Sequence, residues 1–186
     1  MIEFANVNFS YENKPVLNNF NLNVADGQKV CLFGESGCGK STIIDLAVGI
    51  LKPDSGLVTA PNKCSVVFQN DRLLPWYSVI KNVTLPLKNA ETDFAENLLC
   101  EMGLKEYINA DISTLSGGMK RRVAIARALL YSGDVLFLDE AFNGIDEENK
   151  IKIIGLINRY FKNRSILMVS HIKQDAELMG AKIIEL

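Results

Sequence analysis

Residue types that build metal centres, disulfide frameworks and nucleic-acid surfaces are scarce in this sequence. It contains one histidine and four cysteines in 186 residues, and no two cysteines have the C-x-x-C spacing of zinc or redox motifs. The cysteines lie in apolar segments, which predicts buried free thiols in a reducing compartment. The formal net charge is only −2. The chain therefore lacks the basic surface of a dedicated nucleic-acid binder, and we expect no nucleic-acid partner.

Long hydrophobic runs are also missing. No apolar stretch reaches the roughly 18 residues that a membrane span requires, and the first residues do not form a secretory signal. We therefore expect a cytoplasmic protein that meets a membrane only through a partner. Hydrophobic residues make up 48% and charged residues 23% of the chain, as in an ordinary globular protein. The length suits one α/β domain, residues 1–186, with little room for a second.

The first part of the chain is rich in predicted strands. Residues 2–9 and 17–24 alternate apolar and polar side chains on either side of a turn-prone stretch at 12–15. This pattern predicts two half-exposed strands of an antiparallel layer. Three short apolar runs predict further strands, at residues 29–33, 57–59 and 65–69.

The middle of the chain, residues 71–132, has a helical character. Apolar residues recur there at a spacing near 3.6, which predicts helices at 79–85, 94–102 and 118–131. We interpret this segment as a helical subdomain inserted into the core.

Beyond residue 133, short apolar strands alternate with helices. The predicted strands are 135–138, 165–169 and 183–186, and the predicted helices are 146–161 and 173–179. We therefore predict an α/β fold in which residues 1–70 and 133–186 form a nucleotide-binding core with a mostly parallel sheet and an N-terminal antiparallel β layer. Ligands of such sheets bind beyond the carboxyl ends of the strands.

A glycine-rich motif, GESGCGKS, joins the strand at 29–33 to an apolar, helix-length run at 42–50. It fits the G-x-x-x-x-G-K-[ST] phosphate loop, whose amides surround a phosphate while Lys40 and Ser41 reach the terminal phosphates and a Mg²⁺. The helix start adds unpaired N–H groups and a positive dipole end. The predicted nucleotide-binding residues here are Gly34, Glu35, Ser36, Gly37, Cys38, Gly39, Lys40, Ser41 and Thr42. A glycine-rich turn without a ligand is the alternative, and for Cys38 we favour a role as a small filler.

The stretch VLFLDE ends in two acidic residues, Asp139 and Glu140, where a buried strand runs out. An aspartate at this position holds Mg²⁺ in phosphate-loop ATPases. Glu140 is then the candidate to orient or deprotonate an attacking water. The alternative is a pair of acidic residues that caps the next turn.

A second glycine-containing helix start, LSGG, immediately precedes the predicted helix at 118–131. Ser116 could simply be the N-cap of that helix, followed by the permissive glycines Gly117 and Gly118. It could also form a second anion site with the following amides.

The order of these motifs resembles the ATP-binding cassette (ABC) family: a phosphate loop, LSGG running into KRRVAIARALL, and then VLFLDE. The resemblance covers nearly the whole chain. It implies binding of ATP and Mg²⁺, and a head-to-tail dimer with a second copy or a homologous ATPase. In such a dimer the LSGG of one subunit closes over the ATP of the other, so Ser116, Gly117 and Gly118 become nucleotide-binding residues.

The resemblance also assigns roles to individual residues. It gives Tyr11 stacking on adenine, Gln69 contact with Mg²⁺ or the attacking water, and His171 contact with the γ-phosphate. It makes Ser41, Gln69 and Asp139 metal-binding residues, and Glu140, His171 and Gln69 catalytic. Asp146 matches a loop that crosses the dimer interface, although it also suits the N-cap of the following helix. Tyr11 and His171 have structural alternatives, as a surface tyrosine and a structural histidine.

The family branch is less sharply marked. The string FQNDRLLPW is similar to the nitrate, sulfonate and taurine importer ATPases, whereas NVTLPL resembles the lipoprotein-release and cell-division branch. The importer resemblance implies separate permease subunits at the inner face of the membrane, docked after Gln69. There the apolar side chains Leu73, Leu74, Trp76 and Tyr77 have the composition of an interface anchor. Packing inside the helical subdomain is the alternative.

Other classes explain less of the sequence. A DNA-repair or chromosome-structure ATPase of the same superfamily normally carries a long heptad insertion, which this chain lacks. A small GTPase or nucleotide kinase would share only the phosphate loop. Residues 62–65, NKCS, lack the aspartate of a guanine-reading N-K-x-D, and neither class explains LSGG.

Overall fold

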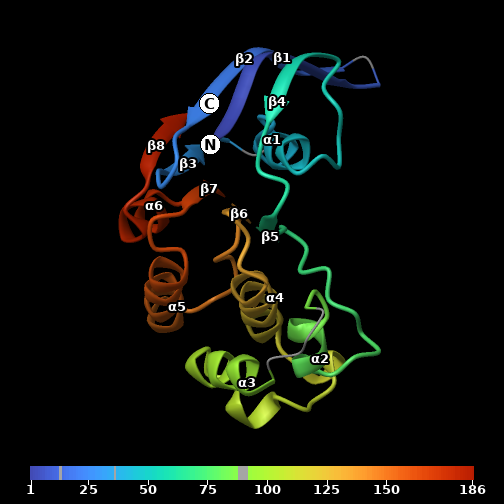
Figure 1. Ribbon diagram of the computed structural model, residues 1–186, viewed down its shortest axis with the longest axis vertical. Helices are drawn as coiled ribbons and strands as arrows, with labels where there is room; N and C mark the ends of the chain where they lie inside the picture. The colour runs from blue at the N-terminus through green and yellow to red at the C-terminus, as the bar shows by residue number, and fades with distance from the viewer. Residues whose placement is uncertain (13, 36, 88–91) are drawn as a thin grey trace.

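The computed structural model describes residues 1–12, 14–35, 37–87 and 92–186. Two β-sheets form its framework (Figure 1). The antiparallel sheet lies at one end of the molecule, and the helices α2 (Val79–Thr84) and α3 (Thr92–Glu101) lie at the other, with the second sheet between them.

The antiparallel sheet contains β1 (Ile2–Tyr11), β2 (Lys14–Val24) and β4 (Ser55–Thr59) in the order β2-β1-β4. It confirms the predicted N-terminal β layer. Both long strands extend further toward each other than the alternation predicted. The pairs Ser10↔Pro15 and Tyr11↔Lys14 continue the ladder past the predicted strand ends, Phe9 and Leu17, because backbone hydrogen bonds do not require alternating side chains.

The second sheet is parallel throughout and has the order β5-β6-β7-β3-β8. Its strands are β3 (Lys29–Phe33), β5 (Cys64–Val67), β6 (Val135–Asp139), β7 (Ser165–Ser170) and β8 (Lys182–Glu185). The mostly parallel sheet is thus confirmed. Because all five strands run the same way, the residues that follow them meet at one edge.

Side chains of the parallel sheet feed two hydrophobic cores. Phe137 of β6 and Leu167 of β7 pack on one face, with the antiparallel sheet and α1 (Lys40–Ala47). Leu136 and Met168, their neighbours in sequence, pack on the opposite face with the remaining helices. Successive strand residues point to opposite faces, so burial on both sides explains why these strands are continuous apolar runs rather than alternating ones.

Further helices pack in the second core. They are α4 (Gly117–Tyr131), α5 (Glu147–Tyr160) and α6 (Lys173–Met179), with short 3-10 helices at Lys105–Tyr107 and Ile112–Thr114. The core on this side runs without interruption from α2 and α3 through α4 to the parallel sheet. No helix in the described part of the chain is long and apolar enough to cross a membrane.

The thiols differ in their environment. Cys31 is fully buried in β3, and burial raises its pKa to about 11. Cys38 and Cys64 are partly buried, whereas Cys100 is exposed at the end of α3. The expectation of a buried thiol is therefore wrong for Cys100, since α3 is amphipathic and turns this position to solvent.

Candidate nucleotide site

The phosphate-loop motif joins the carboxyl end of β3 to the first residue of α1. Gly39 is the N-cap of α1 and has a left-handed backbone, with φ of 97°. A Cβ at this position would lie 2.9 Å from Val16 Cγ1, so both conformation and space require glycine. The helix begins at Lys40, two residues before the predicted apolar run, because loop geometry rather than hydrophobicity sets its start.

Lys40 is 4% exposed, and its ammonium turns back along the loop. Its Nζ donates to the carbonyl oxygens of Gly34, at 2.8 Å, and Glu35, at 2.5 Å, and lies 3.5 Å from Cys38 Sγ. Cys38 Sγ would lie 3.0 Å from a Cβ at Gly34, so it packs against the loop backbone as a filler. Ser36, also predicted to bind nucleotide, lies outside the described residues.

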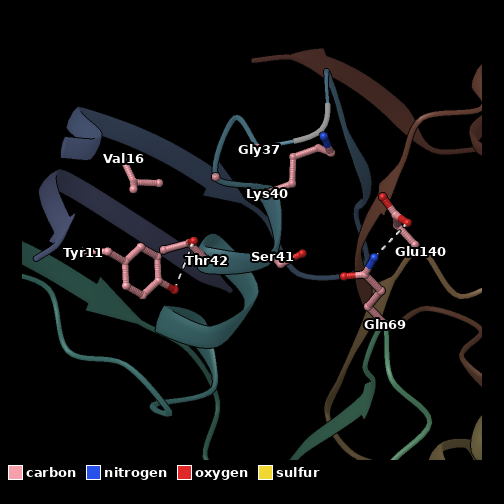
Figure 2. A pocket seen from close by; sticks show the side chains of 9 residues that line it. Tyr11, Val16, Gly37, Lys40, Ser41, Thr42, Gln69 and Glu140 are labelled. Atoms are coloured by element: carbon pink, nitrogen blue, oxygen red, sulfur yellow. Dashed lines mark hydrogen bonds between the residues drawn. The ribbon is translucent and has the colours of Figure 1, made fainter. Parts of the chain in front are cut away.

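A pocket of about 300 Å³ opens beside this loop (Figure 2). Most of its lining was predicted to bind nucleotide or metal, and the lining residues are Tyr11, Val16, Gly37, Gly39, Lys40, Ser41, Thr42, Gln69 and Glu140. Tyr11 is 46% exposed, and its hydroxyl lies 3.5 Å from Thr42 Oγ1. Its ring is therefore open to an aromatic ligand.

Ser41 and Asp139 meet across this edge of the sheet. Ser41 Oγ donates to Asp139 Oδ1 at 3.1 Å, and the carboxylate is 4% exposed. Burial raises the pKa of Asp139, the hydrogen bond from Ser41 partly offsets this, and the charge of Glu140 adds to the rise. A buried carboxylate beside a hydroxyl is a hard oxygen donor pair that fits Mg²⁺. The described residues contain no cluster of three or more His, Cys, Asp or Glu that could hold a metal on its own.

Glu140 occupies a strained position immediately after β6. Its φ is 47°, and its N–H donates to Val169 O at 3.1 Å. The carboxylate accepts from Asn143 Nδ2 at 2.8 Å and from Gln69 Nε2 at 3.4 Å, and it lies 3.7 Å from His171 Nδ1. Strain of this kind persists only where the surroundings enforce it, and it is common at functional sites. The residues that follow β5, β6 and β7 thus converge on one carboxylate.

Other predicted residues line a neighbouring hollow. Gly34, Glu35 and His171 border a space of about 460 Å³ together with Phe33, Glu185 and Leu186. The His171 side chain is 49% exposed, compared with 16% for Glu140. The candidate residues therefore line two separate spaces at the edge of the sheet. Glu140 lines the 300 Å³ pocket, and its carboxylate lies near His171, which borders the second space.

The start of α4 carries Ser116, Gly117 and Gly118 of LSGG, whereas Leu115 is buried in the core. Ser116 is the N-cap, and its Oγ accepts from Met119 N at 3.3 Å. Ser116 and Gly117 are exposed. A Cβ on Gly118 would lie 2.6 Å from Gly144 O, so glycine is required there by close backbone approach. None of these three residues lines the 300 Å³ pocket.

Asp146 caps the next helix, α5. Its Oδ1 accepts from Asn149 N at 3.0 Å, and its Oδ2 accepts from Asn149 Nδ2 at 2.8 Å. The side-chain bond and then the backbone bond lower the pKa of this exposed carboxyl. The predicted N-cap role is confirmed.

The sequence did not identify the residues that hold the loop after Gln69. Arg121 of α4 donates to the carbonyl oxygens of Phe68 and Gln69. Arg127, two turns further along, donates to those of Asp71 and Arg72. The only sequence signal is the presence of four basic residues in a helix that is otherwise largely apolar, at Lys120, Arg121, Arg122 and Arg127. Val16 and Asn143 were also missed, because neither carries a recognisable motif.

This fold and loop define a phosphate-loop NTPase domain. Residues 17–143 match the family model described as ABC transporter. The chain belongs to the ABC transporter family.

Similarity to known import ATP-binding proteins supports this membership. The chain is 36% identical to the aliphatic sulfonates import ATP-binding protein SsuB 1 of Paraburkholderia xenovorans (strain LB400), over 98% of this chain and 56% of that protein. It is 37% identical to the protein of the same name from Paracoccus denitrificans (strain Pd 1222), over 95% of this chain and 75% of that protein. The chain thus spans little more than half of the first relative's length.

Solved structures of similar fold include dimers. The ATP-binding cassette MJ0796, in a dimeric post-hydrolysis state bound to ADP and Pi, matches with a TM-score of 0.90 and 28% identity. That match covers 100% of this chain and 94% of the solved one.

Proposed function

We propose that this chain binds and hydrolyses ATP to drive a membrane transporter. The observation that carries the proposal is the position of Glu140, which contacts Gln69 and Asn143 and lies 3.7 Å from His171, beside a phosphate loop. A carboxylate held this way is suited to orient or deprotonate a water, while the loop holds the phosphates.

In this proposal each site residue has a role that its position supports. Lys40 and the loop amides hold the phosphates, Tyr11 contacts the base, and Ser41 and Asp139 hold Mg²⁺ with Gln69 nearby. When bound, Mg²⁺ neutralises charge that develops on the phosphates. His171 contacts the terminal phosphate from the side of the second hollow.

We further propose that two chains act as a head-to-tail pair. Ser116 and Gly117 are exposed and lie outside the pocket lining, so they are available to a second subunit's nucleotide. The dimeric state of the similar cassette MJ0796 supports this arrangement. In this proposal residues 71–132 act as the helical part that carries the signature, and residues 1–70 and 133–186 as the nucleotide-binding core.

The transporter is proposed to be an importer of aliphatic sulfonates or similarly small solutes. The names of the relatives support this branch over the lipoprotein-release alternative. Trp76 is 71% exposed and Tyr77 37% exposed, in the segment after Gln69. Exposed aromatic side chains suit an interface anchor, and we propose that a permease docks there and holds the chain at the inner face of the membrane.

The test is Glu140→Gln, which keeps the size of the side chain but removes its charge. We expect ATP hydrolysis to fall by about 100-fold or more, because general-base catalysis contributes on that scale, while ATP affinity is retained. Steady-state hydrolysis and equilibrium ATP binding measure the two effects. Glu148→Gln, at an exposed position of α5, is the control. Unchanged turnover in Glu140→Gln would remove the catalytic assignment.

A further inference from the structure

A buried ion pair lies behind the turn that carries His171. Lys150 of α5 is 3% exposed and Asp175 of α6 is 2% exposed, and Lys150 Nζ lies 3.1 Å from Asp175 Oδ1. Burial lowers the pKa of Lys150, but the hydrogen bond to Glu147 and the ion pair with Asp175 outweigh it and leave the pKa raised. Desolvation largely offsets the attraction within such pairs, so they contribute little net stability. The location of this pair is therefore more informative than its strength.

Ser170, the last residue of β7, connects the ion pair to the turn. Its Oγ lies 3.0 Å from Asp175 Oδ2, 3.0 Å from Ile172 N and 3.2 Å from Ile172 O. A hydroxyl has one proton to donate, and the charged carboxylate is the stronger acceptor. Ser170 therefore donates to Asp175 and accepts from Ile172 N–H. The Ile172 carbonyl keeps its own donor, the N–H of Asp175, at 3.2 Å.

His171 lies between the two residues that this network fixes. Its side chain is 49% exposed, so packing does not hold the imidazole. Its distance to Glu140 depends instead on the backbone of residues 170–172. Asp175 orients the Ser170 hydroxyl, and Lys150 pairs with Asp175 inside the protein. The geometry points to Ser170 as a positioning residue for His171, with the Lys150–Asp175 pair as its support. This inference rests on the proposed role of His171 in ATP hydrolysis.

The test compares two serines of the same strand. Ser170→Ala removes the hydroxyl without leaving a buried charge unpaired. Ser165→Ala is the matched control at the other end of β7, because both serines are 4% exposed. Ser165 Oγ likewise bonds two backbone groups, accepting from Gly27 N at 3.1 Å and donating to Ala25 O at 3.1 Å. We expect kcat to fall about 10-fold in Ser170→Ala, less than the roughly 100-fold that a 1 Å misplacement of reacting groups can cost. KM for ATP should stay unchanged, and Ser165→Ala should keep the wild-type kcat. Equal kcat values in the two variants would overturn the inference.

A double-mutant cycle tests whether Ser170 acts through His171. In a His171→Ala background, adding Ser170→Ala should cause no further loss of kcat, because the group being positioned is gone. A second 10-fold loss in that background would contradict the inference.

Spectroscopy gives a readout that does not depend on activity. The chain has one histidine, so its imidazole NMR signals are unambiguous. Ser170→Ala should shift or broaden them, and Ser165→Ala should not; unchanged signals in both variants would refute the positioning role. If wild-type protein hydrolyses no ATP, the proposed function fails, while this measurement still judges the positioning of His171.

A second variant covers the case in which Ser170→Ala does not fold. Lys150→Met combined with Asp175→Leu removes the acceptor of Ser170 and leaves no buried charge unpaired, because Glu147, the other partner of Lys150, is exposed. Proteins tolerate this type of replacement well. It should reproduce the selective loss of kcat and the change in the His171 signals. Wild-type kcat and signals in this variant would overturn the inference.

Discussion

Two helices of this chain start at glycine-containing loops, and their first turns are completed differently. At α1 the N-cap is Gly39, which has no side chain, and the Lys40 ammonium lies folded into the loop. At α4 the N-cap is Ser116, whose hydroxyl accepts from Met119 N. The start of α1 borders a pocket, whereas the start of α4 is exposed. Because Ser116 accepts one N–H and still has its proton to donate, it can cap its own helix and bind a phosphate oxygen at once. The first start is suited to bind phosphate within one chain, and the second only across an interface.

The largest expected effect is on ATP binding at the start of α1. Lys40→Ala removes a buried ammonium directed at the loop, and loss of a buried charge from a binding site costs about 2–5 kcal/mol. We expect ATP affinity to fall by about 30-fold to 4,000-fold on the same scale. Titration calorimetry measures this, with Lys52→Ala at an exposed position as control. Wild-type affinity in Lys40→Ala would show that the two starts do not differ as proposed.

The start of α4 should matter for ATP hydrolysis but not for ATP binding by a single chain. Ser116→Arg places a bulky cation at the proposed interface, so we expect hydrolysis to be lost while the monomer keeps near-normal ATP affinity. Steady-state hydrolysis and binding assays separate these effects.

A mixing experiment makes the comparison sharper. Lys40→Ala and Ser116→Arg chains are each inactive alone in a head-to-tail pair. In a mixed pair both defects fall in one site, and the other site combines an intact loop with an intact signature. Mixing should therefore restore hydrolysis. If activity does not return on mixing, or if Ser116→Arg alone stays active, the two starts do not complete one another's site.

Local patterns explain which features the sequence predicted. The strand β6 and the phosphate loop depend on neighbouring residues, so their apolar run and glycine spacing were sufficient. The start of α1 was predicted two residues late because the apolar run was placed from Thr42, whereas the helix begins at Lys40, directly after its N-cap Gly39.

Contacts between distant segments had no such signal. Arg121 reaches the carbonyl of Gln69, 52 residues away in the sequence, and a side chain bonded to a backbone carbonyl leaves no residue pattern at the partner position. The Ser170–Asp175 bond joins nearby residues, yet it depends on how α6 turns back onto β7. The roles given to the candidate residues remain predictions.

The two glycines of the second start should differ in their effect on stability. A Cβ on Gly118 would lie 2.6 Å from Gly144 O, whereas nothing lies within 4 Å of one on Gly117. Gly118→Ala should therefore lower the free energy of unfolding by about 1–3 kcal/mol, and Gly117→Ala should leave it unchanged or slightly raised. Urea denaturation measures both. Equal destabilisation by the two substitutions would mean that the close approach to Gly144 does not constrain this helix start.

The smallest expected effect separates the two uses of the Ser116 side chain. Ser116→Ala removes the cap and should cost about 1 kcal/mol of stability, whereas aspartate caps helices as well as serine does, so Ser116→Asp should cost almost nothing. The rates of ATP hydrolysis should have the opposite order to the stabilities. The carboxylate of the aspartate variant would repel the phosphates, whereas the alanine variant only lacks a hydrogen-bond donor. We therefore expect the alanine variant to be less stable but more active, and the aspartate variant to be more stable but inactive. Thermal unfolding and ATP hydrolysis measured on the same preparations give both rankings. If activity followed stability across the pair, the serine would serve only its own helix, and the two helix starts would no longer be two halves of one site.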